Sequence, residues 1–300
     1  MILDYKDKSK DDWFLVSWTL SNKCNYRCSY CPDFLHNGST GQPRWDTVER
    51  FVKNFKQPNK EICYRISGGE PTHWKHFIDF AKLVKDQGHT FSFLTNGSKS
   101  VEYYDTLLKY TDGYIISYHP EFADLEHIKK VVKSSNCPVI INLMLTPDNF
   151  NEMYDIAEQI FLNSENVSVW PKIVLDKSNI DAITNEPGKY SKEQLSVIKD
   201  WPYFRSLDDS TLHRGEMMLD GNPVSANDLI TTGRNKFRDW SCWAGLHMIN
   251  IDMWGNIYRA DCKESGALGN LERYKLPTTT LKCSRETCAC LSDIYLKKEK

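Results

Sequence analysis

The sequence lacks any hydrophobic run long enough to cross a membrane. Its most apolar segment, Val139 to Leu145, is interrupted by Asn142, whereas a membrane-spanning helix needs about 20 predominantly apolar residues. A secretory signal is also missing, because the first residues are polar and mixed in charge, where such a signal has a basic start and an apolar stretch. These two absences predict a soluble protein of the cytoplasm.

An excess of positive charge is missing as well. The 38 Lys and Arg residues are balanced by 40 Asp and Glu residues, and the formal net charge is −2. Domains that bind nucleic acids usually carry a basic surface, so the composition gives no strong nucleic-acid signal, although a local basic groove stays open. Repeats and low-complexity tracts are absent apart from a short charged tail, Lys297 to Lys300, which we expect to be solvated.

The sequence does contain a regular alternation of β-rich runs and amphipathic stretches. From Trp13 to about Leu175, short runs rich in β-branched and aromatic residues are separated by longer stretches with apolar residues three and four positions apart. This alternation indicates βα units around a parallel sheet, an α/β fold. The predicted strands are 13–20, 61–67, 90–95, 113–118, 138–145 and 167–175, and the predicted helices are 47–55, 73–85, 102–110, 125–133 and 150–161.

The βα alternation stops after about Tyr203. A region punctuated by Gly and Asn residues follows, and it contains a predicted hairpin at 248–258 that turns at residues 254–256. We therefore expect two domains, the larger at 10–202 and a small second one at 203–300. In parallel α/β folds the loops that follow the strands carry the chemistry, so these loops of the first domain are the place to look for a site.

The sequence is rich in cysteine, with ten residues of this type. In a small secreted domain this count suggests disulfides, but in a long cytosolic chain it points toward metal ligands or redox chemistry. Cys63 and Cys137 stand alone and are interpreted as small buried hydrophobes. The others form two groups: Cys24, Cys28 and Cys31 near one end, and Cys242, Cys262, Cys283, Cys288 and Cys290 near the other.

The first group follows the first predicted strand. On a helix, Cys24 and Cys31 would be about 10 Å apart along the axis, so we predict a loop wrapped around a metal. Thiolates suit iron–sulfur clusters or zinc. A structural zinc site is almost always closed by four ligands, whereas this loop offers three, and three thiolates on a four-iron cluster leave one iron open. A zinc site and three unrelated thiols remain the alternatives.

The spacing Cys24-x3-Cys28-x2-Cys31, with Tyr30 before the last cysteine, resembles the signature of the radical S-adenosylmethionine (SAM) superfamily. The resemblance implies that the three cysteines are the catalytic residues, that they hold a [4Fe–4S] cluster, and that SAM chelates the fourth iron. An electron from the cluster would then cleave SAM to methionine and a 5′-deoxyadenosyl radical. The implied fold is a partial (β/α)6 TIM-like barrel at 10–202.

A second motif agrees with this resemblance. Gly68, Gly69, Glu70 and Pro71 follow the second predicted strand and are similar to the GGEP element that contacts the SAM amino group in the family. Glycine permits a close backbone approach, and a carboxylate can accept hydrogen bonds from an ammonium group. On its own this motif would be interpreted as an ordinary turn. Because it follows the cysteine loop, it supports the resemblance.

The same resemblance implies three further cofactor contacts. Tyr30 is expected near the adenine of SAM, whereas Ser117, at the end of the fourth predicted strand, and Asn142, within the fifth, are candidate polar contacts to SAM. The alternative for the two strand residues is structural, because polar side chains at strand ends often satisfy nearby backbone groups.

The second cysteine group resembles the twitch and SPASM extensions of radical SAM enzymes, in which a hairpin and a Cys-rich segment hold auxiliary clusters. Its five cysteines fall short of the seven in a full SPASM domain, so the resemblance implies a twitch-like domain with one auxiliary [4Fe–4S] cluster. A zinc ribbon is the alternative, and a fifth thiol would be either a hydrogen-atom donor or an inert cysteine. The spacings are Cys242-x12-Gly255-x6-Cys262 and Cys283-x4-Cys288-x1-Cys290.

These resemblances predict a radical SAM oxidoreductase or epimerase that abstracts hydrogen from a small carbohydrate or a nucleotide-linked sugar. An external one-electron reductant such as flavodoxin or ferredoxin is the implied partner. The first alternative is maturation of a ribosomally made peptide, which the short segment before the first predicted strand disfavours because it cannot form a leader-recognition domain. The second is a non-catalytic iron–sulfur electron carrier or sensor, which would not explain the GGEP motif.

Overall fold

The computed structural model describes residues 1–174, 190–207, 216–288 and 291–300. Its larger sheet has nine strands in the order β13-β12-β11-β2-β3-β4-β5-β6-β7. Strands β2 to β7 are all parallel and lie in chain order, which makes the sheet a partial TIM-like barrel, as predicted. These strands are β2 (Trp13–Thr19), β3 (Glu61–Ser67), β4 (Thr90–Thr95), β5 (Gly113–Tyr118), β6 (Val139–Leu145) and β7 (Val167–Ile173).

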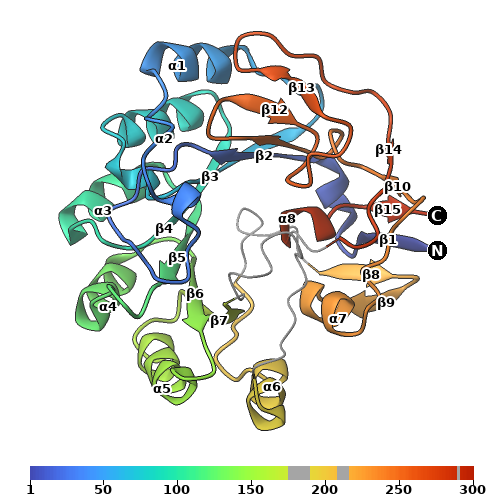
Figure 1. Ribbon diagram of the computed structural model, residues 1–300. Coiled ribbons are helices and arrows are strands. Elements are labelled where there is room, and N and C mark those ends of the chain that lie inside the picture. The colour runs from blue at the N-terminus through green and yellow to red at the C-terminus, as the bar shows by residue number, and fades with distance from the viewer. Residues whose placement is uncertain (175–189, 208–215, 289–290) are drawn as a thin grey trace.

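Helices α1 to α5 cover the outer face of this curved sheet (Figure 1). Side chains alternate between the two faces of each strand, and the outward ones, such as Trp18, Ile66 and Phe93, are fully or almost fully buried beneath the helices. None of the helices in the described ranges is long and apolar enough to cross a bilayer. The bounds are α1 (Trp45–Asn54), α2 (Phe77–Asp86), α3 (Val101–Leu107), α4 (Leu125–Ser134), α5 (Phe150–Phe161) and α6 (Lys192–Lys199).

The predicted strands and helices of this region agree with the observed ones to within a few residues. The largest shift is at α2, which begins at Phe77 because Pro71 first starts a short 3-10 helix and Trp74 leaves the helical conformation. The end of the last predicted strand, residue 175, lies outside the described residues. Helix α6 was not predicted. The 3-10 helices are η1 (Lys8–Asp12), η2 (Asp33–Leu35), η3 (Pro71–His73) and η4 (Leu108–Tyr110).

The predicted hairpin is present and extends the barrel sheet. Strand β11 pairs antiparallel with β12 and parallel with β2, and Gly255 takes a positive φ of 81° in the turn. The carboxylate of Asp252 accepts hydrogen bonds from the amides of Trp254 and Asn256, at 3.0 and 2.9 Å. The three strands are β11 (Met248–Ile251), β12 (Asn256–Tyr258) and β13 (Ala267–Asn270).

A second sheet, in the order β14-β10-β15-β1-β8-β9, brings both ends of the chain together (Figure 1). The charged tail was expected to be solvated, and this expectation is wrong for Lys298, which is 1% exposed within β15. The domain boundary at 202/203 stays a prediction. The elements are β1 (Ile2–Tyr5), β8 (Met217–Leu219), β9 (Asn222–Val224), α7 (Ala226–Thr231), β10 (Ser241–Cys242), β14 (Leu281–Lys282), α8 (Leu291–Ile294) and β15 (Lys298–Glu299).

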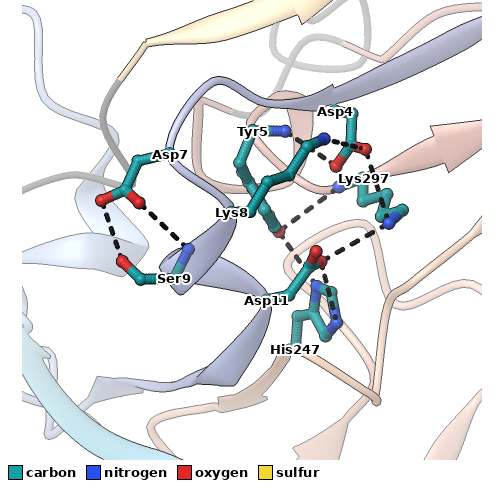
Figure 2. Close-up of polar contacts among 8 residues, drawn as sticks. All are labelled: Asp4, Tyr5, Asp7, Lys8, Ser9, Asp11, His247 and Lys297. Carbon is teal, nitrogen blue, oxygen red and sulfur yellow. Dashed lines mark hydrogen bonds and ion pairs between the residues drawn. The ribbon is translucent and has the colours of Figure 1, made fainter.

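Polar contacts fasten the first strand to the C-terminal segments (Figure 2). The ammonium of Lys297 lies 3.5 Å from a carboxylate oxygen of Asp4 and 3.5 Å from one of Asp11. The hydroxyl of Tyr5, which is fully buried, is hydrogen-bonded to Nδ1 of His247 at 3.1 Å. Charged pairs shielded from water are screened less than exposed ones. This network joins β1 to the residue before β11, His247, and to the residue before β15, Lys297.

Candidate metal centre

The cysteine loop leaves the barrel at the end of β2 and has no helix between Cys24 and Cys31, as predicted. Cys28 is buried, whereas Cys24 and Cys31 are partly exposed. The amide of Cys31 donates to the carbonyl oxygen of Cys28 at 3.0 Å, and the amide of Tyr26 donates to the sulfur of Cys24 at 3.4 Å. The turns made by these bonds bring the three cysteines onto one compact loop.

The three thiols influence one another electrostatically. Burial raises the pKa of the Cys28 thiol to about 11, and nearby Cys31 and Cys24 raise it further. Burial also raises the pKa of Cys24. Metal ligands of this type must be deprotonated, so metal binding here would release protons and make affinity depend on pH. Three mutually close soft donors on one loop fit an iron–sulfur cluster with one open iron.

The two glycines of the GGEP motif are needed because the turn after β3 lies directly against the cysteine loop. The amide of Gly69 donates to the carbonyl oxygen of Ser21, and that of Glu70 to the carbonyl oxygen of Lys23, both at 2.8 Å. A Cβ on Gly68 would lie 2.6 Å from the oxygen of Ser21. A Cβ on Gly69 would lie 2.6 Å from the oxygen of Lys23. Only glycine fits at either position without displacing the loop backbone.

Glu70 is 1% exposed and holds the ends of two strands together. Its carboxylate accepts hydrogen bonds from the Thr72 hydroxyl at 2.6 Å, the Thr95 hydroxyl at 2.8 Å and the Asn96 amide at 2.6 Å. Burial raises the pKa of this carboxyl, and the donors partly offset the increase. Pro71 is buried where η3 begins. Glu70 therefore braces the turn, and its contact with the SAM amino group stays a prediction.

Asn96, at the end of β4, is a contact that the sequence reasoning missed. Its side-chain amide lies 3.9 Å from the sulfur of Cys24 and donates to the Asn25 side-chain oxygen at 2.8 Å. An N–H directed at a cluster sulfur is one of the groups that tune an iron–sulfur centre. Asn96 comes directly after the predicted strand 90–95, but nothing in the sequence pattern links it to the cysteine loop.

Tyr30 lies within an aromatic and polar cluster beside the loop. Its hydroxyl is hydrogen-bonded to Nδ1 of His119 at 2.8 Å, and the two rings stack with centroids 5.9 Å apart. Burial lowers the pKa of His119 to about 4, so the ring is neutral at physiological pH. The amide of Ser29 donates to the carboxylate of Glu121 at 2.8 Å. Both contacts tie the loop to the segment after β5.

Ser117 and Asn142 are direct neighbours on β5 and β6. Both are partly exposed, while the residues on either side of them in their strands are buried. They therefore lie on the inner face of the barrel, opposite the helices. The structure brings these two predicted residues together, and their contact with SAM stays a prediction.

Lys172, in β7, is a second residue that the sequence reasoning missed. It lies two positions after Trp170, on the same face of the strand, and it pairs in register with Met144 of β6. Burial lowers the pKa of its ammonium group to about 8, and no hydrogen bond or ion pair within the described residues involves this group. A lysine in a strand carries no motif, so only the structure identifies it.

Four cysteines of the second group also come together. The thiols of Cys242 and Cys283 are close enough to raise the pKa of the Cys288 thiol, and Cys288 in turn raises the pKa of the Cys262 thiol. Burial raises the pKa of Cys288 to about 12. Cys290 lies outside the described residues. A set of four thiols is the usual ligand set of a [4Fe–4S] cluster, so the donors fit such a group.

No set of three His, Cys, Asp or Glu side chains within the described ranges is arranged to hold a single metal ion.

Comparison with known proteins finds a family that matches part of this chain. The sequence profile of the Radical SAM superfamily matches residues 18–133, the region that carries the cysteine loop and the GGEP motif. An S-adenosylmethionine-dependent nucleotide dehydratase of Selenomonas ruminantium is 30% identical over 86 residues, which are 28% of this chain and 30% of that protein. The radical SAM cyclopropyl synthase TigE of Paramaledivibacter caminithermalis is 25% identical over 300 residues, covering 85% of this chain and 59% of that protein.

The chain therefore spans less than two thirds of the length of these two relatives. Two solved structures have the same fold. Native anSMEcpe with bound AdoMet has a TM-score of 0.55 at 18% identity, covering 86% of this chain and 78% of that one. Streptococcus suis SuiB bound to the precursor peptide SuiA has a TM-score of 0.57 at 15% identity, covering 88% of this chain and 64% of that one.

Proposed function

We propose that the chain is a radical SAM enzyme, in line with the family match over residues 18–133, and that Cys24, Cys28 and Cys31 hold its [4Fe–4S] cluster. When bound, the cluster supplies the electron that splits SAM into methionine and a 5′-deoxyadenosyl radical. The observation that carries the proposal is the contact between the cysteine loop and the GGEP turn. The amides of Gly69 and Glu70 hold the loop backbone at the barrel rim, where a reacting cofactor would face the inner strands.

The surrounding residues of the chain position this site. Asn96 directs an amide N–H toward the Cys24 sulfur, and Glu70 keeps Asn96 in place through its backbone amide. The rings of Tyr30 and His119 stack beside the loop cysteines, and we propose that they help to shield a bound cofactor from water. Ser117 and Asn142 offer polar groups on the inner face for the bound SAM. A radical must be shielded from solvent to react selectively, and this arrangement serves that purpose.

We propose that the substrate is a small anionic molecule of the nucleotide-linked sugar type, which undergoes dehydrogenation or epimerisation. Lys172 supports this assignment, because its partly buried ammonium group is available to pair with a phosphate on the inner face. Trp170, on the same face, offers an aromatic surface for a ring. One of the relatives is named as a nucleotide dehydratase, in agreement with a nucleotide-like ligand.

We also propose an auxiliary [4Fe–4S] cluster held by four of the five C-terminal cysteines, which would accept an electron from the substrate radical or bind the substrate. An external one-electron donor such as flavodoxin or ferredoxin would reduce the SAM-binding cluster. We propose a cytoplasmic location, because a reducing compartment keeps cysteine thiols from forming disulfides and leaves them able to bind a metal.

Peptide maturation is the second candidate function. It is favoured by the sequence match with TigE over 85% of this chain and by the likeness in fold to SuiB, whose structure contains a precursor peptide. A peptide would have to reach the same inner face of the barrel. The two candidates differ in what Lys172 should recognise, since a peptide does not need an anionic group.

Anaerobic reconstitution with iron, sulfide, SAM and dithionite tests the central proposal. We expect the protein to form 5′-deoxyadenosine and Cys28→Ala to abolish its formation. Cys137→Ala is the matched control, because Cys137 is a buried cysteine outside both groups. Redox activity without 5′-deoxyadenosine would instead support an electron carrier or sensor. Formation of 5′-deoxyadenosine by Cys28→Ala would contradict the assigned cluster site.

A further inference from the structure

Lys298 is a buried cation placed opposite a cysteine of the proposed auxiliary site. In the antiparallel pair of β15 and β10 it is the register partner of Cys242, and it is only 1% exposed. Its ammonium group donates to the carbonyl oxygens of Asp293 at 2.6 Å and Leu296 at 3.0 Å. Burying a charge is costly unless it is paired and hydrogen-bonded, so the surroundings of Lys298 must compensate for its burial.

Asp293 supplies part of that compensation and also reaches a second cysteine. It is 2% exposed, and its carboxylate accepts hydrogen bonds from the amides of Asp261 at 3.0 Å and Cys262 at 2.7 Å. The same carboxylate attracts the ammonium group of Lys298. The position of the Cys262 backbone therefore depends on a side chain from α8, which lies far along the chain.

The thiols themselves lie close to this pair. Cys242 and Cys288 are both within electrostatic reach of the Lys298 ammonium group, and Cys262 is within reach of Asp293. Cys242 is on β10, Cys262 follows β12, and Cys288 precedes α8. Lys298 and Asp293 thus contact the segments of Cys242 and Cys262, and their charges also act on the Cys288 thiol.

We propose that Lys298 and Asp293 are positioning residues of the auxiliary site, and that the fixed charge of Lys298 raises the reduction potential of the cluster held there. This inference rests on the proposed auxiliary cluster. Four thiolates give such a cluster a net negative charge that grows by one on reduction. A nearby cation stabilises the more negative state more strongly, because the interaction is proportional to the charge, and burial limits screening by salt.

Lys297 provides a matched control beside Lys298. Its side chain leaves the strand in the other direction, toward Asp4 and Asp11 (Figure 2), at 3.5 Å from each carboxylate. Its ammonium group also lies 5.3 Å from the centre of the Trp243 ring. Lys297→Met therefore removes a lysine from the same segment whose charge is paired with two carboxylates, whereas Lys298 lies opposite Cys242.

The test is a potentiometric titration, followed by electron paramagnetic resonance, of the full chain carrying Cys28→Ala, which removes the signal of the other cluster. Iron is counted first. About four irons per chain show that the auxiliary cluster is present, and a value near zero overturns the proposed cluster itself, whatever Lys298 does. With the cluster present, Lys298→Met should make reduction about tenfold less favourable, which is 59 mV for a one-electron couple.

Lys297→Met and Lys298→Arg should leave the potential unchanged, the second because it keeps the charge. Loss of auxiliary iron from a folded Lys298→Met protein would support the positioning role. If Lys298→Met does not fold, Asp293→Asn decides, because loss of the negative charge should raise the potential and a fall or no change would overturn the proposal. An unaltered potential in Lys298→Met with full iron, or an equal shift in Lys297→Met, would also overturn it.

Discussion

The two cysteine groups of this protein are assembled in different ways. Cys24, Cys28 and Cys31 lie on one short loop, and the structure fixes that loop through backbone contacts with the GGEP turn. The C-terminal cysteines come from separate segments, which are brought together by strand pairing and by the hydrogen bond from the Cys262 amide to the Asp293 carboxylate. A local ligand set needs a turn that fits closely, whereas a distant set needs side chains that hold its segments in place.

The two groups also differ in the charge beside them. Near Cys24 the contacting group is the neutral amide of Asn96, and the opposite charges of Glu70 and Arg27 act at longer range. Near Cys242 and Cys288 the cation of Lys298 acts together with the carboxylate of Asp293, and it acts more strongly. A cation lowers the cost of adding an electron to a negative cluster more than a neutral dipole does. The comparison therefore predicts a more easily reduced auxiliary cluster, which would suit it to accept an electron from a substrate radical.

Among the variants considered, Gly69→Ala should have the largest effect, because it should disturb the N-terminal cysteine loop and leave the C-terminal cysteines unchanged. The new Cβ would lie 2.6 Å from the Lys23 carbonyl oxygen, so the cysteine loop must move, and a displacement near 1 Å at a reacting centre can cost about 100-fold in rate. We expect 5′-deoxyadenosine formation to fall by about that factor, while iron bound by the C-terminal cysteines stays unchanged.

Gly88→Asn is the matched control for this variant, because a Cβ at Gly88 meets nothing within 4 Å and Asn tolerates its positive φ. The measurements are the rate of 5′-deoxyadenosine formation and the iron content of each variant. Wild-type rates in Gly69→Ala would show that the close contact between turn and loop is unimportant.

The same contrast explains what the sequence could predict. The cysteine loop, the GGEP turn and the βα rhythm are local patterns, and the strands β3, β4 and β5 begin and end where the patterns indicate. The backbone contacts between the cysteine loop and the GGEP turn explain why both motifs are present in this chain. A match to a family over residues 18–133 covers this local part of the chain.

What the sequence could not predict depends on contacts between distant segments. Lys298 belongs to a short charged tail that looks solvated, and only the pairing of β15 with β1 and β10 makes it buried. Lys172 is one lysine in a strand, and its orientation toward the inner face follows from the register of β7. Charge patterns alone do not report burial, because burial is decided by the segments that pack around a residue.

Lys172→Met should have an intermediate effect that leaves both clusters intact. A charge-assisted hydrogen bond is worth about 1.5–3 kcal/mol, so the KM for an anionic substrate should rise by at least about tenfold. Because burial lowers the pKa of Lys172 to about 8, the group is charged below that pH and neutral above it. Affinity should therefore weaken as the pH rises through about 8 in the wild type and stay flat in the variant.

Lys172→Arg is the control that keeps the charge, and steady-state kinetics over pH 6.5 to 9 supply the measurement. A wild-type KM in Lys172→Met would remove the support for an anionic substrate and favour the peptide alternative. Iron content and 5′-deoxyadenosine formation without substrate should be the same in all three proteins.

Asn96→Ala should have the smallest effect. It tests whether a neutral group changes the reduction equilibrium of a cluster less than the cation of Lys298 does. The amide lies 3.9 Å from the Cys24 sulfur, a long contact for a neutral donor, so its loss should change the reduction equilibrium of the SAM-binding cluster by less than about fivefold. Potentiometry of this variant, compared with Lys298→Met, measures the difference directly. A larger shift in Asn96→Ala than in Lys298→Met would show that the neutral contact, rather than the buried cation, dominates the tuning of these clusters.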